Sequence, residues 1–94
     1  MILTVDIEKE MPGSYVARAS VGGVEVTAHQ IYDRIETAIR QQALNVPEGF
    51  ANFIQFSYYG MSTGTYAIKE VPPLAAQMAD RLVALIAEQH QINQ

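Results

Sequence analysis

The sequence predicts an α+β protein, in which a mostly antiparallel sheet of about five strands has two helices packed on one face. Two N-terminal runs alternate apolar and polar residues, as half-buried strands do. Two longer segments instead repeat apolar residues at helical spacing, and an aromatic-rich hairpin lies between them. The expected order of elements is therefore β-β-β-α-β-β-α. A chain of 94 residues has room for one hydrophobic core, which predicts a single domain over residues 1–94.

The first two strands are predicted to pair as an antiparallel hairpin. Leu3–Lys9 and Tyr15–Val21 each place apolar side chains on one face, and a proline-glycine turn separates them. Matching the two apolar faces leaves two registers, and each puts an acid, Asp6 or Glu8, opposite Arg18. An exposed pair of this kind stabilises a sheet only slightly, so we interpret this side as a solvated face and not as a site.

A capping-box pattern predicts where the first helix begins. Val24–Thr27 is expected to form a short third strand, and Thr27-Ala28-His29-Gln30 has the Thr-x-x-Gln form that starts many helices. The helix is then predicted over Ala28–Leu44, and a proline and a glycine between residues 45 and 49 end it. Its apolar stripe comprises Ile31, Ile35, Ala38, Ile39 and either Gln42 or Ala43.

Phe50–Val71 is predicted to be the centre of the fold, because it holds six of the eight aromatic residues. Two strands, Ala51–Tyr59 and Thr65–Val71, are expected on either side of a turn bounded by Gly60 and Gly64. Both faces of the first strand carry large apolar side chains. We therefore expect a central strand that is at least partly covered on both sides.

The C-terminal helix is predicted over Leu74–Gln89. It follows Pro72-Pro73, which is favourable because proline is tolerated in the first turn of a helix. Its apolar arc is wide and predicts contact with more than one surface. The arc comprises Leu74, Ala75, Met78, Ala79, Leu82, Val83, Leu85 and Ile86.

Composition excludes several functional classes. The chain has no cysteine, which rules out disulfides and thiolate chemistry. Its formal charge is −4 and its six Lys and Arg residues are scattered singly, so nucleic acid is not an expected partner. No stretch approaches the roughly 20 apolar residues of a membrane span, and the N-terminus lacks a signal-peptide pattern. We therefore predict a soluble cytoplasmic protein with no membrane partner, no cofactor and no metal.

The candidate site is a polar-aromatic surface on the second hairpin. Tyrosine combines a large contact area with a polar tip, and small hydroxyl residues beside it give adaptable hydrogen bonding. The alternative interpretation is ordinary sheet and turn chemistry, with the tyrosines packed under a helix. The predicted interaction residues are Phe53, Gln55, Ser57, Tyr59, Ser62, Thr63 and Thr65.

Two further patterns are interpreted as structural. The segment from Gly60 to Thr65 has glycines and hydroxyls that suit an anion, but it lacks the P-loop lysine and a following helix, which favours a hairpin turn. His29 and Asp33 have a spacing that suits two metal ligands on a helix, whereas zinc needs three or four. No catalytic residue is predicted.

Residues Leu3–Ala43 resemble the β-β-β-α opening of HicB-type antitoxins. The shared features are the Ile7-Glu8-Lys9 strand, the glycine turn before Tyr15-Val16, and a short strand that leads into an amphipathic helix. The proline-and-glycine segment that the family has before its third strand is replaced here by Gly22-Gly23. In its order of elements the chain is also similar to type III secretion chaperones, which begin with a helix that is missing here.

The function predicted from the sequence is a small non-catalytic protein-binding or self-associating module, adaptor-like, chaperone-like or antitoxin-like. Its expected partner is another protein chain or a second copy in a homodimer, bound by the apolar-aromatic face that the helices leave uncovered. The alternative is a small-molecule-binding protein or an enzyme. Its cleft would lie between the C-terminal helix and the Phe50–Val71 hairpin, with Tyr58, Tyr66 or His29 as polar groups.

Overall fold

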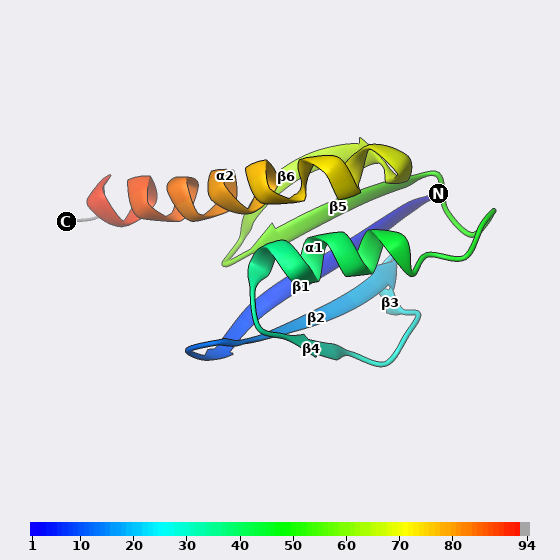
Figure 1. Ribbon diagram of the computed structural model, residues 1–94, viewed down its shortest axis with the longest axis horizontal. Coiled ribbons are helices and arrows are strands. Elements are labelled where there is room, and N and C mark those ends of the chain that lie inside the picture. The colour runs from blue at the N-terminus through cyan, green and yellow to red at the C-terminus, as the bar shows by residue number, and fades with distance from the viewer. Residues whose placement is uncertain (93–94) are drawn as a thin grey trace.

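The computed structural model describes residues 1–92 and confirms the α+β class, with both helices on one face of the sheet (Figure 1). Over these residues the sheet has six strands in the order β3-β2-β1-β5-β6, and β4 also pairs with β2. The elements are β1 Ile2–Met11, β2 Ser14–Val21, β3 Val24–Glu25, β4 Gln30–Tyr32, α1 Ile35–Leu44, β5 Phe53–Tyr58, β6 Met61–Ala67, a 3₁₀ turn at Ile68–Glu70, and α2 Val71–Ile92.

The β1–β2 hairpin confirms the first of the two predicted registers. Asp6 lies directly opposite Arg18, and Val5 lies opposite Ala19. The apolar side chains of the predicted alternating face point to the helices and are buried, namely Leu3, Val5, Ile7, Ala17 and Ala19. The Arg18 guanidinium extends diagonally to Glu8, with 3.3 Å between Nη1 and Oε2. Both side chains of this ion pair are solvent-exposed, so it stabilises the hairpin only slightly.

The sheet is mixed because β5 lies beside β1 in parallel. Ile2 pairs with Phe53 at one end of this contact, and Ile7 pairs with Tyr58 at the other. The remaining strand pairs are antiparallel. Strand β1 therefore lies at the centre of the sheet, and α1 belongs to the connection that returns the chain to β5 (Figure 1).

The predicted start of the first helix is wrong. Thr27–Gln30 does not cap a helix, because Gln30–Tyr32 forms strand β4 and α1 begins at Ile35. Ile31, which its spacing places on the helical stripe, instead pairs with Val16 of β2, so the sheet supplies its backbone hydrogen bonds. The third strand is also shorter than predicted. It ends at Glu25, after which the Val26 N–H donates to the Ala19 carbonyl at 3.0 Å.

The second hairpin turns earlier than predicted. Its loop is Tyr59-Gly60, and both residues have positive φ, 50° and 79°, as a two-residue type I′ turn requires. Strand β6 therefore begins at Met61, and Gly64 lies inside it at a bulge with φ of 85°. The bulge sets Thr63 and Gly64 opposite Phe56. The predicted strand over Thr65–Val71 ends at Ala67, before the 3₁₀ turn.

Helices α1 and α2 cover the same face of the sheet and close one core. Strand β5 is fully covered on one side and only in part on the other: Ile54 and Phe56 are buried under the helices, whereas on the opposite face Phe53 is exposed and Gln55 and Ser57 are half-buried. The core cluster comprises Leu3, Val5, Ile7, Ala17, Ala19, Ile35, Ala38, Ile39, Ala43, Ile54, Phe56, Tyr58, Val71, Ala75, Met78, Ala79 and Leu82.

Helix α2 begins at Val71, so both prolines lie in its first turn, as predicted. Val71, Ala75 and Leu82 are fully buried against the sheet and α1. The C-terminal part of α2 extends beyond the end of the sheet (Figure 1). Among the described residues, no helix is both long enough and apolar enough to cross a membrane.

Candidate functional site

The sheet face opposite the helices, called the open face below, carries an apolar row at one end. The parallel pairing of β1 and β5 sets Ile2 beside Phe53, and Phe53 in turn pairs with Ala67 on β6. Ile2 is 46% exposed and Phe53 is 45% exposed, although both are large apolar side chains. These two adjacent side chains form a small apolar patch that is exposed to solvent in the isolated chain.

An uncharged row lies next along the strands. Cross-strand pairing places Thr65, Gln55, Thr4 and Ser20 side by side across β6, β5, β1 and β2. The Thr65 hydroxyl donates to Gln55 Oε1 at 3.3 Å. Glu25 of the short strand β3 follows Ser20 at the edge of the sheet. Between its edges this row offers hydroxyl and amide groups, which both donate and accept hydrogen bonds.

A charged row follows, with Ser62, Ser57, Asp6 and Arg18 side by side. The Ser57 hydroxyl donates to the Asp6 carboxylate. Arg18 forms an ion pair with Glu8, which lies two residues beyond Asp6 on β1. The uncharged row therefore separates Phe53 from this charged row on the open face.

The predicted interaction residues divide into two groups. Phe53, Gln55, Ser57, Ser62 and Thr65 share the open face, and the structure brings them together on adjacent strands. Tyr59 belongs to the turn beyond the charged row, where it is exposed and lines a shallow hollow with Asp6 and Arg18.

Thr63 lies apart from this surface. It is 9% exposed, and its hydroxyl accepts the Phe56 N–H at 3.2 Å and donates to the Gly64 carbonyl at 2.9 Å. Its role is therefore to satisfy the backbone at the bulge.

Sequence reasoning missed Ile2, because its place beside Phe53 depends on the parallel pairing of β1 and β5.

Tyr58 is buried on the helix side of β5, at the end nearest the turn. Its ring lies 6.2 Å from that of Tyr15 and 4.6 Å from that of Tyr59, measured between ring centroids. Burial, with smaller contributions from the neighbouring Tyr59 and Tyr15, raises the pKa of Tyr58 to about 12. The phenol therefore stays neutral and acts as a packed core side chain.

The other polar groups singled out in the sequence do not gather at one place. Tyr58 and Tyr66 belong to opposite ends of the second hairpin. His29 precedes β4 on the far edge of the sheet and lines a hollow with Glu8 and Arg18. Asp33 follows β4, so it does not share a helical face with His29. Within residues that the structure describes, no group of three or more His, Asp or Glu side chains is placed to hold a metal ion.

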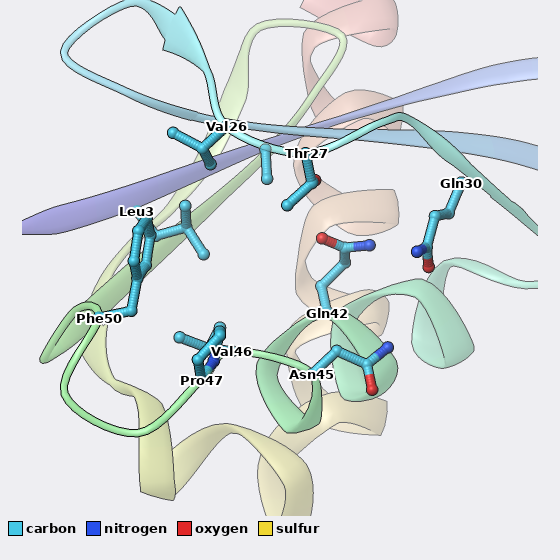
Figure 2. A pocket seen from close by; sticks show the side chains of 10 residues that line it. Leu3, Val26, Thr27, Gln30, Gln42, Asn45, Val46, Pro47 and Phe50 are labelled. Atoms are coloured by element: carbon cyan, nitrogen blue, oxygen red, sulfur yellow. The ribbon is translucent and has the colours of Figure 1, made fainter.

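A pocket of about 130 Å³ lies on the helix side of the sheet, at the end where β1 begins. Figure 2 shows Leu3 and Phe50 on one side of it and Gln42 and Asn45 on the other. Val26 and Thr27 lie above the pocket, and Val46 and Pro47 lie below it (Figure 2). This pocket could not be predicted from the sequence, because its walls come from four separate segments of the chain.

A hydrogen-bond chain fixes the polar wall of this pocket. Gln42 is 8% exposed, and its Nε2 donates to the Tyr32 hydroxyl at 3.0 Å. The Tyr32 hydroxyl donates in turn to Gln30 Oε1 at 2.6 Å. Because its nitrogen is used in this way, Gln42 turns its Oε1 atom to the pocket side (Figure 2).

Comparison with models of known protein families, with curated proteins and with solved structures finds no match to the chain. What the protein binds is therefore inferred from the chemistry of the open face and of the pocket.

Proposed function

We propose that the chain is a non-catalytic protein-binding module of the cytoplasm whose open face binds a second copy of itself. The observation that carries the proposal is the apolar row, where Ile2 and Phe53 are adjacent and nearly half exposed at one end of the open face. Covering such a pair removes apolar surface from water, at about 25 cal/mol per Å².

The uncharged row makes a second copy a suitable partner. In a two-fold dimer the same patch faces itself, so its groups must be self-complementary. Thr65, Gln55 and Thr4 meet this condition, since hydroxyl and amide groups both donate and accept. A two-fold axis between β1 and β5, parallel to the strands, sets the apolar row against the apolar row of the partner and the uncharged row against the uncharged row. The charged rows of the two copies then lie at one end, outside the two rows that meet.

The sheet edges are less suited to self-association than the open face. Strand β6 carries a bulge at Thr63 and Gly64, which interrupts the ladder that an added strand requires. The opposite edge is made of β3 and β4, which are two and three residues long. Short and bulged edges are features that protect sheets from edge-to-edge pairing.

The contact covers part of one face of a 94-residue chain, so we expect a weak dimer that depends on concentration. Light scattering after size-exclusion chromatography, over a series of concentrations, measures this directly. The molar mass should rise from 10.4 kDa toward twice that value as concentration increases. Phe53→Ser should raise the dimer dissociation constant by at least about tenfold, because burial of a Phe side chain contributes about 1.5–3 kcal/mol.

Tyr59→Ser is the matched control. It removes another exposed aromatic side chain after the same strand, but beyond the charged row. We expect this variant to dimerise like the wild type, provided that circular dichroism shows both variants folded. A molar mass that stays at 10.4 kDa at every concentration, or an equal loss of dimer in both variants, would contradict the proposal.

A further inference from the structure

We propose that the pocket between Phe50 and Gln42 binds a small uncharged molecule, about the size of one aromatic ring, that carries an O–H or N–H donor. The pocket lies on the helix side of the sheet, since it is lined by Leu3 and Ala19, whose side chains point to the core. Ile2 and Phe53 lie on the opposite face. The proposed dimer contact therefore leaves the pocket free, and the two proposals stand independently.

The size of the pocket sets the size of the ligand. Its volume is about 130 Å³, and an apolar protein cavity of about 150 Å³ takes up benzene. Phe50, Leu3 and Val26 supply an apolar wall for the body of such a molecule (Figure 2). A single ring fits this space, whereas a nucleotide or a drug-sized ligand requires a pocket of about 300 Å³ or more.

Gln42 specifies the polar end of the ligand. This side chain is more than nine-tenths buried, and its Nε2 is held by the Tyr32 hydroxyl. Its Oε1 atom faces the pocket (Figure 2), and the hydrogen bond to Tyr32 uses only the amide nitrogen. No buried side-chain oxygen among the described residues lacks a partner, so Oε1 is accessible from the pocket, where a ligand O–H or N–H takes the place of water as its donor.

The lining also excludes ions. The side chains around the pocket are apolar, amide or hydroxyl groups, and no Asp, Glu, Lys, Arg or His is among the described residues that line it. A charged ligand would lose hydration here without meeting an opposite charge, which is unfavourable.

The backbone around the pocket favours a free molecule over a peptide. Extended peptides bind largely through main-chain hydrogen bonds. The N–H groups of Val26, Val46 and Phe50 already donate within the chain, to Ala19, Ala43 and Pro47 respectively. A bound peptide would find these donors occupied, whereas a ring with one donor group does not need them.

The test is an NMR titration of the ¹⁵N-labelled full chain with phenol. Saturable shifts are expected at Thr27, at Val46 and at the side-chain amide of Gln42. Anisole has the same ring but no O–H donor, so we expect it to bind about three- to tenfold more weakly than phenol. Gln42→Met removes the acceptor and should bring the two affinities together.

Val26→Trp and Val24→Trp form a matched pair of variants. Val26 is 37% exposed at the rim of the pocket, and a Trp side chain there fills the space. Val24 is 68% exposed on β3 and does not line the pocket. Phenol binding should be lost in Val26→Trp and kept in Val24→Trp. If Val26→Trp does not fold, the proposal is tested by the phenol and anisole affinities alone, measured for the wild type and for Gln42→Met.

Three results would overturn the proposal. The first is the absence of saturable shifts with phenol, and the second is equal binding of phenol and anisole by the wild type. The third is binding of N-acetyl-tyrosinamide at the same residues more tightly than phenol, which would assign the pocket to a side chain of a partner protein.

Discussion

Tyr58 couples the stability of the core to alkaline pH. Its pKa is raised to about 12 by burial, while a tyrosine in the unfolded chain titrates near 10. Between these values the unfolded chain loses the proton and the folded chain keeps it, so rising pH favours unfolding. The stabilisation is fully present below pH 10 and is lost as pH rises through about 12. The two-unit difference corresponds to about 2–3 kcal/mol.

Chemical denaturation at pH 7 and at several pH values up to 12 measures this effect. Wild-type protein should lose stability steeply above pH 10, and Tyr58→Phe should lose on the order of 2 kcal/mol less over the same range, because it has no proton to release. Equal slopes for the two proteins would show that the Tyr58 hydroxyl is not shielded from water in the folded state.

Thr63 illustrates what a residue type alone does not reveal. In the sequence it belongs to a run of small hydroxyl residues, which predicts an exposed polar surface. In the fold its hydroxyl is buried and bonded to the backbone of Phe56 and Gly64. Whether such a group faces solvent or the backbone depends on the bulge, and the bulge depends on the register between two strands.

Helix α1 begins without a side-chain cap. Its N-cap residue, Arg34, has an extended backbone, with φ of −141° and ψ of 151°, and makes no capping hydrogen bond. This backbone conformation suits Ser, whose hydroxyl accepts a hydrogen bond from an otherwise unpaired N–H of the first turn. Arg34→Ser should therefore raise the free energy of unfolding by about 1 kcal/mol, which shifts Tm by roughly 4–8 °C in a chain of this size.

Arg34→Ala separates the cap from the charge. Both substitutions remove a cation that is unfavourable near the positive end of the helix dipole, and Ala adds no acceptor. Thermal unfolding of both variants should place Arg34→Ser above Arg34→Ala by most of the expected shift. Equal Tm values would mean that the first-turn N–H groups are already satisfied by water.

At the scale of elements, the sequence patterns that were correct are the ones decided by local periodicity. Alternation predicted the β1–β2 hairpin and its buried face, and helical spacing together with two prolines predicted α2. The capping-box pattern at Thr27 failed because β4 pairs with β2 and takes the backbone groups that a helix would use. The turn was misplaced because Tyr59, a non-glycine residue, adopts positive φ, which its residue type does not favour.

At the scale of the molecule, the open face could be predicted in part. The expectation that two helices pack on one side and leave Phe53 uncovered agrees with the structure. The character of that face was not predictable, since it depends on which strands are neighbours. Because β1 pairs with β5 in parallel, Ile2 lies beside Phe53 and Asp6 lies beside Ser57. The exposed apolar side chains of these two strands are therefore separated from the charged one. The same pairing brings Leu3 close to Phe50 and helps to form the pocket.

The net charge of the molecule makes a final prediction about the proposed dimer. Each copy carries a formal charge of −4, so two copies repel one another, while the rows proposed to meet contain no charged side chain apart from Glu25 at the edge. Salt screens this repulsion: the Debye length falls from about 30 Å at 0.01 M to about 3 Å at 1 M. At constant protein concentration, sedimentation equilibrium should therefore show a larger dimer fraction at high salt, and Phe53→Ser should remain monomeric throughout. If salt instead dissociates the dimer, the contact is held by ion pairs of the charged row, and the arrangement proposed for the two copies is wrong.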